Sequence, residues 1–352
     1  MYCTGNEVIF ERSDQAFVRK FGAEVAAQMV LDYQSAYSLP FLYDTYQLAR
    51  FLKIRRKALF NCVRHCDQAY RTITLKKKNG GTRRIHVPRG QLRACQDKIL
   101  HEILSRLPVS KYAKAYSKGS TLVQNAAPHV GKKYILKLDI TDFFNSIYFE
   151  KVYSAAFNIQ YFPKQIGVML TALCCRRNFL PQGAPTSPAI SNLVMRNFDD
   201  AIGSWCEQRG ISYTRYCDDM TFSSNHPLFA VYEKVKKMLE DMNLELNERK
   251  TNFFTRANRQ SVTGLTVNDK VSVSRSYKQQ LRQEVYYVLK FGLAEQILHV
   301  KNEHFITDGV PDTEAYFLHL LGRLRFVLQI EPENRWFQTA LVQLQSKQSS
   351  DQ

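Results

Sequence analysis

Residues 212–224 read SYTRYCDDMTFSS, and in them two strand-forming arms flank Cys217, Asp218 and Asp219. The β-branched and aromatic residues of both arms favour strands, so the segment predicts a hairpin with two acids at its turn. Two adjacent carboxylates repel each other unless a cation compensates them. The turn is therefore a candidate for binding metal ions.

A third acid ends another predicted strand. Residues 133–138 form a short apolar strand that stops at Asp139. Three carboxylates on adjacent strands can hold two magnesium ions about 3.5 to 4 Å apart, which activates an attacking hydroxyl and stabilises a leaving phosphate. The set indicates nucleotidyl transfer.

The remaining segments alternate between helical and strand patterns, which predicts a mixed α/β fold. Helices are expected over residues 14–61, 91–107 and 231–239 and at several places after residue 264, with a basic hairpin over 70–88, a strand at 244–247 and a strand pair around 268–269. The helices after residue 264 suggest a separate helical part.

The charge is strongly positive and unevenly distributed. The 352 residues carry a formal net charge of +17, and residues 1–130 hold 22 Lys and Arg against 9 Asp and Glu. Such a surface suits a polyanion, with nucleic acid as the first candidate partner and an anionic membrane as the second. A solvated basic face without a dedicated partner is the alternative.

The cysteines and the first residues suggest a cytoplasmic protein. The eight cysteines form no pair of CxxC motifs, and Cys62, His65 and Cys66 have no second pair of ligands for a structural zinc. No apolar run reaches the ~18 to 20 residues of a membrane span, and the first residues are too polar for a signal peptide. We expect reduced thiols and no membrane partner.

Four blocks together carry a family resemblance: KLDITDFFNSI (137–147), LPQGAPTSPAISN (180–192), YCDD (216–219) and LELNERKT (244–251). Their order and spacing resemble the palm motifs of reverse transcriptases. The resemblance implies an RNA-directed DNA polymerase shaped like a right hand, with deoxynucleoside triphosphate substrates and two Mg²⁺ ions. It also implies three domains. N-terminal helices and fingers would take residues 1–130, the palm 131–262 with a fingers segment at about 152–180, and the thumb with C-terminal helices 263–352.

The resemblance assigns catalytic roles to four residues. Asp139 and Asp218 look like the principal magnesium ligands, and Asp219 would add charge and direct ligation. Lys250 matches the lysine proposed to protonate the leaving pyrophosphate, whereas an exposed lysine after a strand is otherwise ordinary.

Five residues match the family's nucleotide-binding positions. Phe144 matches the bulky residue that excludes a ribose 2′-hydroxyl, with core packing as the plain alternative. Gln182 and Gly183 match the segment against the incoming nucleotide, where a glycine permits close backbone approach. In the basic hairpin, Arg83 matches the arginine that contacts the triphosphate, and Lys77, or its neighbour Lys76, matches the lysine partner.

Two short motifs point to the retron branch of the family. Asn125 and His129 fit an NAxxH signature, and Val262, Thr263 and Gly264 fit a VTG signature. We predict that these residues bind RNA. The plain interpretation of the histidine is a core or helix-end position.

Membership of that branch implies several partners. A cognate non-coding RNA would serve as template and primer, and an internal guanosine 2′-hydroxyl would start a branched multicopy single-stranded DNA (msDNA). A nearby effector or toxin protein is expected by analogy with retron antiphage systems. Two alternatives stay open: another group II-like or abortive-infection reverse transcriptase, and a nucleic-acid-binding scaffold that restrains a toxic effector.

Overall fold

The computed structural model describes residues 2–4, 7–11, 14–76, 80–300, 303–307 and 309–350. The chain divides into two units, and each is described by itself. The first unit contains residues 1–120, 137–220 and 229–252, and the second contains 121–136, 221–228 and 253–352. Among the described residues, no helix combines the length and apolarity needed to cross a bilayer.

The first unit holds the N-terminal helices and the long central helices. Its elements are β1 (Tyr2–Thr4), β2 (Glu7–Ile9), α1 (Gln15–Phe21), α2 (Ala23–Tyr37), α3 (Thr45–Phe51), α4 (Arg56–Arg64), β3 (Tyr70–Lys76), β4 (Thr82–Pro88), α5 (Gly90–Glu102), α7 (Phe149–Ala156), α8 (Lys164–Cys174), α9 (Ser187–Glu207), β6 (Ser212–Tyr216) and α10 (Phe229–Asp241). The helices predicted over 14–61, 91–107 and 231–239 are thereby confirmed.

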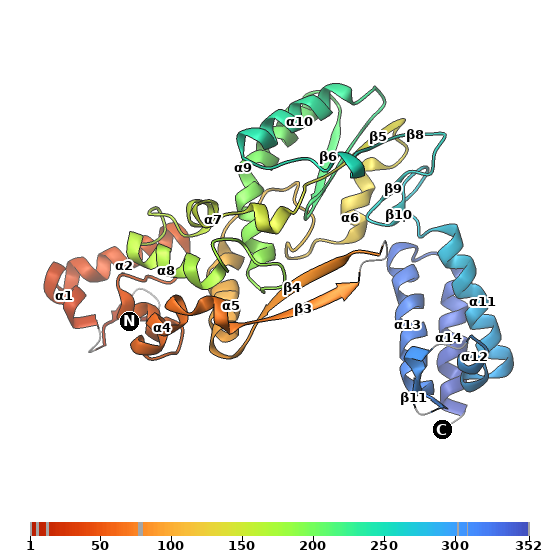
Figure 1. Cartoon of the computed structure of the whole chain (residues 1–352), viewed down its shortest axis with the longest axis horizontal. Coiled ribbons are helices and arrows are strands. Elements are labelled where there is room, and N and C mark those ends of the chain that lie inside the picture. The colour runs from red at the N-terminus through yellow and green to blue at the C-terminus, as the bar shows by residue number, and fades with distance from the viewer. Residues whose placement is uncertain are drawn as a thin grey trace. The chain divides into compact units, whose positions relative to one another are not determined.

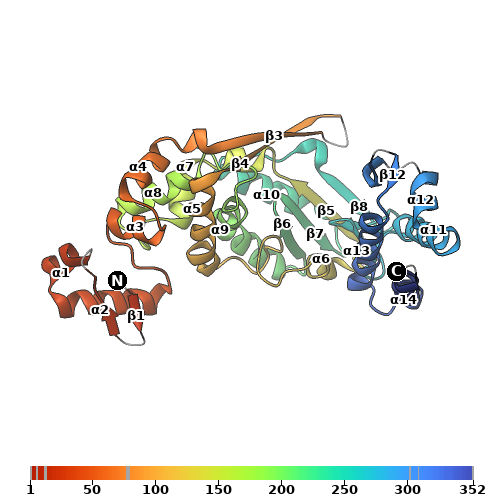
Figure 2. The ribbon, with the colours of Figure 1, turned by 90° about the horizontal axis from the view of Figure 1, so that it is seen from below.

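A four-stranded sheet carries the candidate site. Its order is β6, β7 (Asp219–Ser224), β5 (Tyr134–Asp139) and β8 (Asn252–Thr255), and the strands lie side by side in Figure 2. The α9 helix packs on β6. The predicted hairpin around Asp218 and the predicted strand before Asp139 are confirmed.

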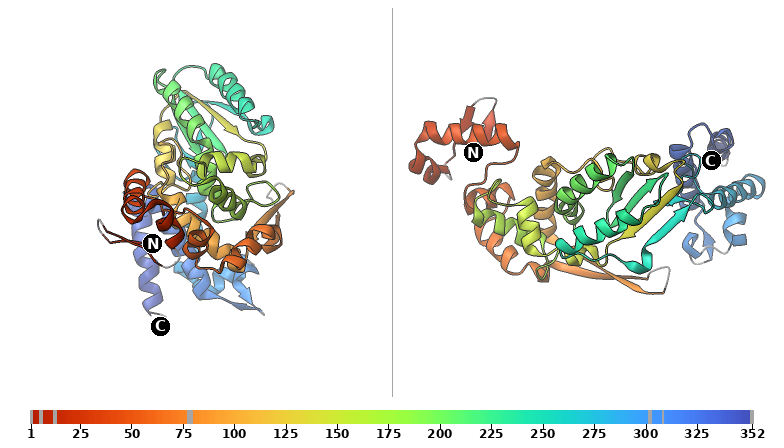
Figure 3. Two further views of the ribbon diagram at one scale, coloured as in Figure 1. Left: turned by 90° about the vertical axis from the view of Figure 1, so that its left-hand side faces the viewer. Right: turned by 90° about the horizontal axis from the view of Figure 1, so that it is seen from above.

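The basic hairpin is also confirmed. Strands β3 and β4 pair antiparallel from Tyr70 opposite Pro88 to Lys76 opposite Thr82, and they form the long orange ribbon of Figure 3. Most of its side chains are exposed, as expected of a two-stranded ribbon with little core beneath it.

The second unit is mainly helical. Its elements are α6 (Leu122–Ala126), β9 (Ser261–Val262), β10 (Leu265–Thr266), α11 (Arg275–Phe291), α12 (Leu293–Val300), β11 (Ile306–Thr307), β12 (Val310–Pro311), α13 (Thr313–Ile330) and α14 (Arg335–Ser350). Helices α11 to α14 are labelled in Figure 1. Buried apolar faces join them: Leu281 and Val285 of α11 pack in one core with Leu320 and Leu324 of α13 and with Phe337 of α14.

The expectation of a mixed α/β fold is confirmed, with two local corrections. Residues 244–247 do not form a regular strand, because Leu246 makes only one isolated bridge, to Ile140. The named strand pair after residue 260 turns at Thr263 and Gly264, and an isolated bridge between Thr266 and Ser272 surrounds residues 268–269. In both places a strand-like composition overstated the extent of the pairing.

Candidate active site

Backbone hydrogen bonds bring the three predicted acids to one edge of the sheet. The amide of Ile140 donates to the carbonyl of Asp218 at 3.3 Å, so the end of β5 meets the turn that precedes β7. On the other side of β5, the amide of Asn247 donates to the carbonyl of Asp139 at 2.8 Å. The segment before Lys250 is thereby held beside the end of β5.

A polar cavity of about 600 Å³ opens at this edge. It brings together six of the residues predicted from the sequence, which are Arg83, Asp139, Phe144, Gln182, Asp218 and Lys250. These residues come from a hairpin, a strand end, two short 3-10 helices, a loop and a turn that are far apart in the chain. The cavity is lined both by carboxylates and by the exposed arginine of β4, so it can hold a polyanion together with cations.

Lys250 forms an ion pair with Asp139. Its Nζ donates to both carboxylate oxygens of Asp139 at 2.9 and 2.8 Å. The carboxylate is nearly buried, whereas 58% of the lysine side chain is exposed. Partial burial opposes protonation, but the hydrogen bonds and charge of Asp139, helped by Asp218 and Asp219, raise the pKa of Lys250. The lysine is therefore a protonated donor inside the cavity.

The electrostatics of Asp219 test whether a divalent cation fits here. Desolvation, reinforced by the nearby carboxylates of Asp218 and Asp139, raises the pKa of Asp219 to about 6, although the side chain itself is exposed. Accumulated negative charge of this kind is relieved by a hard cation with oxygen ligands. In the described ranges, however, no three His, Cys, Asp or Glu side chains are arranged as a ready-made metal site. The chemistry of the donor set fits Mg²⁺, and the Lys250 ammonium balances part of the charge.

The Gln182–Gly183 segment lies directly against the basic hairpin. The amide of His86 in β4 donates to the carbonyl of Gln182 at 2.7 Å. Gly183 has φ +112°, and a Cβ built there would lie 2.3 Å from Cγ2 of Ile85 and 3.0 Å from the carbonyl oxygen of His86. A glycine is therefore required, because both the backbone conformation and the close approach of β4 exclude a side chain.

Two residues in this area escaped the sequence analysis. His86 lines the cavity, and burial together with the charges of nearby arginines lowers its pKa. Lys137 lies two residues before Asp139, where burial lowers its pKa and the charge of Asp219 opposes that shift. The period of two along a strand places Lys137 on the same face as Asp139, which is the sequence signal that could have identified it. Lys77 lies outside the described residues.

A fully buried ion pair lies behind the turn that carries Asp218 and Asp219. The guanidinium of Arg215 donates from Nε and Nη2 to Asp199 of α9 at 2.8 and 2.6 Å, and from Nη1 to the carbonyl of Cys217 at 2.8 Å. Tyr213 donates its hydroxyl to the same carboxylate at 2.7 Å. Cys217 has φ +62°, in the left-handed region. The ion pair therefore ties a strained residue of the turn to the longest helix.

Comparison with known proteins agrees with this geometry. The family model "Reverse transcriptase (RNA-dependent DNA polymerase)" matches residues 75–281. The retron Ec86 reverse transcriptase of Escherichia coli is 31% identical over 268 residues, which cover 75% of this chain and 83% of that protein. The retron Ec83 reverse transcriptase of the same species is 33% identical, with the same two coverages.

The chain belongs to the retron reverse transcriptases. It is thus an RNA-directed DNA polymerase, of a family that generally uses divalent metal ions. The retron Mx65 reverse transcriptase of Myxococcus xanthus is 32% identical over 292 residues, which cover 77% of this chain and 62% of that protein. A solved structure of telomerase from Candida albicans aligns over 78% of this chain and 56% of the telomerase chain with 12% identity and a TM-score of 0.42, a similarity too low to carry an argument.

The two retron motifs lie in the second unit and contact each other. The Asn125 side chain donates to the hydroxyl of Thr263 at 3.3 Å. Thr263 and Gly264 form the two-residue turn between β9 and β10, and both have positive φ, +45° and +86°. Positive φ at both positions is typical of tight type I′ hairpins, but it is unusual for a β-branched threonine. Strain of this kind is often retained at functional sites.

Burial corrects the expectation that every motif residue touches RNA. Asn125, His129 and Val262 are at most 1% exposed. The His129 ring instead forms a hydrogen bond with the Ser223 hydroxyl at 2.7 Å. These three side chains present almost no surface to RNA in this structure; Asn125 supports the turn through Thr263, whereas His129 is bound to Ser223 of β7. Thr263 is half-buried and Gly264 is exposed.

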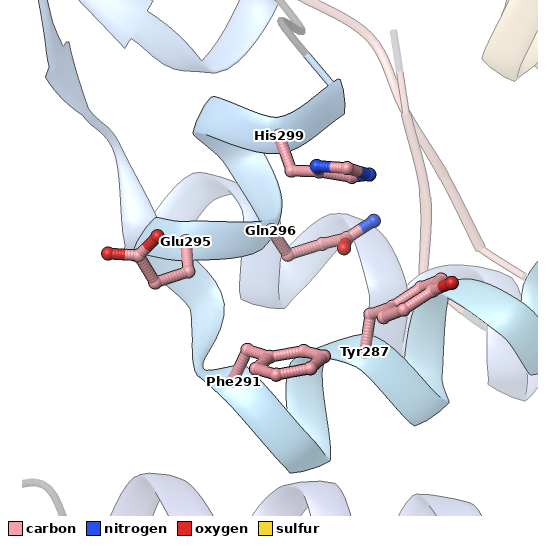
Figure 4. Close-up of a pocket in the computed structure, with 5 residues that line it drawn as sticks. All are labelled: Tyr287, Phe291, Glu295, Gln296 and His299. Atoms are coloured by element: carbon pink, nitrogen blue, oxygen red, sulfur yellow. The ribbon is translucent and has the colours of Figure 1, made fainter.

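A separate pocket of about 450 Å³ lies between α11 and α12 of the second unit, and Figure 4 shows its lining. Tyr287 stacks on Phe291 with ring centroids 5.9 Å apart, and the His299 ring lies 6.1 Å from Tyr287. Gln296, which is 4% exposed, lies between these rings. The sequence analysis did not identify this aromatic pocket, because Tyr287 and Phe291 read there as ordinary helix residues.

Proposed function

We propose that this retron polymerase copies a cognate, structured non-coding RNA into msDNA, starting from the 2′-hydroxyl of an internal guanosine. The observation that supports it best is the cavity in which Asp139, Asp218 and Lys250 face the basic arm of β4. Nucleotidyl transfer needs both acidic and basic side chains in one cavity, because the reaction brings a triphosphate to a metal-binding edge.

In this proposal Asp139, Asp218 and Asp219 hold two Mg²⁺ ions. When bound, the ions would activate the attacking hydroxyl and stabilise the leaving phosphate. Both carboxylate oxygens of Asp139 accept hydrogen bonds from the Lys250 ammonium, so the lysine is positioned as a proton donor near the reacting groups. A proton donor placed there can neutralise the departing pyrophosphate.

The incoming deoxynucleotide would lie between β4 and the catalytic edge. Arg83 is exposed on β4 and available for the triphosphate. Phe144 is half-buried at the cavity wall, where its ring would collide with a ribose 2′-hydroxyl. Gln182 and Gly183 would support the base pair between nucleotide and template.

We further propose the arrangement of a right hand for the chain. Residues 1–130 would supply the N-terminal helices and fingers, 131–262 the palm with a fingers segment at about 152–180, and 263–352 the thumb. The thumb would recognise a stem-loop of the RNA by shape and phosphates, because the deep major groove of A-form RNA hides its bases. The turn at Thr263 and Gly264 is the exposed part of the retron motifs that can reach RNA.

A protein partner completes the proposal. By analogy with retrons that act in antiphage defence, we propose that the polymerase and its msDNA restrain an effector or toxin encoded nearby. This part rests on family analogy alone.

The test is to express the gene with its native upstream flank, purify the protein and extract the bound nucleic acid. We expect a small DNA joined to RNA that is released only by ribonuclease or debranching treatment. Asp218→Asn should abolish this DNA. Asp241→Asn, which makes the same chemical change at an exposed helix end, should retain it.

Two other outcomes would correct the proposal. Extension of a DNA primer on poly-rA without any branched product would keep the polymerase and reject msDNA synthesis. Bound RNA without synthesis in either assay would favour a nucleic-acid-binding scaffold.

A further inference from the structure

The surface of α3 and α4 carries an uncompensated positive charge away from the catalytic cavity. Residues 45–66 contain six Lys and Arg and no Asp or Glu. Arg50 is neutralised by Glu11 at 2.8 Å. The other five are exposed, and none forms an ion pair with a carboxylate in the described part of the chain; they are Lys53, Arg55, Arg56, Lys57 and Arg64.

Two exposed aromatic rings lie among these cationic side chains, and one arginine holds both rings in place. The guanidinium carbon of Arg56 lies 4.2 Å from the ring centroid of Tyr46 and 5.5 Å from that of Phe60. Its Nε donates to the hydroxyl of Thr45 at 2.9 Å. Tyr46 is 53% exposed and Phe60 43% exposed. The arginine therefore orders both rings while leaving much of each accessible.

The positions also follow a regular spacing along α4. Arg56, Phe60 and Arg64 are four residues apart, so they form one stripe with steps of about 6 Å. The adjoining side of the helix is fixed, because Leu59, which lies about 100° around the helix axis from Phe60, is fully buried and α4 packs against α8, beside which it lies in Figure 2. The stripe is thus a rigid, outward-facing row that alternates cation, ring and cation.

We propose that this surface, the α3–α4 face, binds single-stranded RNA. Rings beside unpaired cations favour an unpaired strand, because bases stack on exposed rings while phosphates meet the cations. A merely solvated basic face explains the charge but gives no reason for two exposed aromatic rings ordered by Arg56. That the face binds a single strand follows from its rings and cations, and only the identification of that strand as RNA rests on the proposed function.

The test measures binding of a fluorescein-labelled, unstructured 20-nucleotide RNA by anisotropy at several salt concentrations, without nucleotides. Arg55→Gln, Lys57→Gln and Arg64→Gln together should reduce the slope of log affinity against log salt by about 2, because each phosphate contact on a single strand contributes about 0.7. Phe60→Ala should weaken binding by roughly 5-fold or more, and Phe60→Tyr should restore it.

The matched control replaces three exposed lysines elsewhere: Lys164→Gln, Lys237→Gln and Lys270→Gln. It changes the net charge equally and should leave the slope almost unchanged. Equal slopes for the two triple variants would overturn the proposal. Phe60→Tyr keeps an aromatic ring at this position and so separates loss of the ring from misfolding. If the folded Phe60→Tyr protein fails to restore binding, stacking on the ring is contradicted.

Asp218→Asn separates this inference from the proposed function. It should abolish DNA synthesis and leave the RNA affinity and its salt slope unchanged. Loss of synthesis alone therefore says nothing against the α3–α4 face, and loss of binding in the α4 variants says nothing against the catalytic cavity.

Discussion

The buried pair of Arg215 and Asp199 gives the sharpest prediction. Both side chains are completely buried. In Arg215→Met, the Asp199 carboxylate loses its guanidinium partner, and of the donors described above only the Tyr213 hydroxyl remains. Removing one partner of a buried ion pair costs about 3–5 kcal/mol, because the other charge stays desolvated without compensation. The carbonyl of Cys217 loses a donor as well. We expect the free energy of unfolding to fall by that amount.

Urea unfolding followed by circular dichroism measures the effect. The control is Arg209→Met, which removes an exposed arginine stacked on Trp205 and should cost less than about 1 kcal/mol. The double variant Asp199→Leu with Arg215→Met should recover part of the loss, since neither charge is then left alone. If Arg215→Met costs no more than the control, the argument from the buried charge is refuted.

Four further outcomes are expected. Gly183→Ala should force β4 away from residue 183 at Ile85, cost about 1–3 kcal/mol in urea unfolding and raise the KM for deoxynucleotides; an unchanged midpoint and KM would contradict the close approach. Because the pKa of Asp219 is raised to about 6 from an ordinary value near 3.9, the metal-free protein should gain stability as the pH falls from 6 to 4, and Asp219→Asn should remove that gain. Equal pH profiles for the two proteins would reject the shift. Lys250→Met should change stability by less than about 1 kcal/mol, because the lysine is largely exposed, yet slow DNA synthesis on the order of 100-fold in single-turnover kinetics. Phe144→Val should raise ribonucleotide incorporation relative to deoxynucleotide incorporation in primer extension, and an unchanged ratio would assign the ring to packing alone.

Local patterns predicted the parts of the site that local interactions build. The acids at 139, 218 and 219 follow strands whose composition is strand-forming along their whole length, so their positions at the sheet edge could be predicted. The strand expected at 244–247 failed for the opposite reason. Its alternation is regular, but Leu246 makes only an isolated bridge to Ile140 and Asn247 one backbone bond to Asp139, because continued pairing depends on a neighbour that the segment itself does not specify.

Contacts between distant segments could not be predicted from the sequence. The amide of His86 meets the carbonyl of Gln182 through backbone atoms, which leave no trace in residue type. Arg215 looks like a solvent-facing strand residue, because fully buried arginines are rare, yet Asp199 on α9 provides its partner. The retron motifs show the same limit: the sequence identified them, but not that Asn125 and His129 are buried, with Asn125 bound to the turn at Thr263 and His129 to Ser223 of β7.

The ion pair between Lys250 and Asp139 joins two residues that the ribosome makes at different times. The two residues are 111 positions apart. At roughly 5–20 residues per second, translation delivers the lysine about 6 to 20 seconds after the aspartate. During that interval the nascent chain carries the strand that ends at Asp139 without the segment that covers its outer side. The nascent chain is then open to mispairing at that strand, and a slower ribosome over residues 140–250 would prolong the exposure.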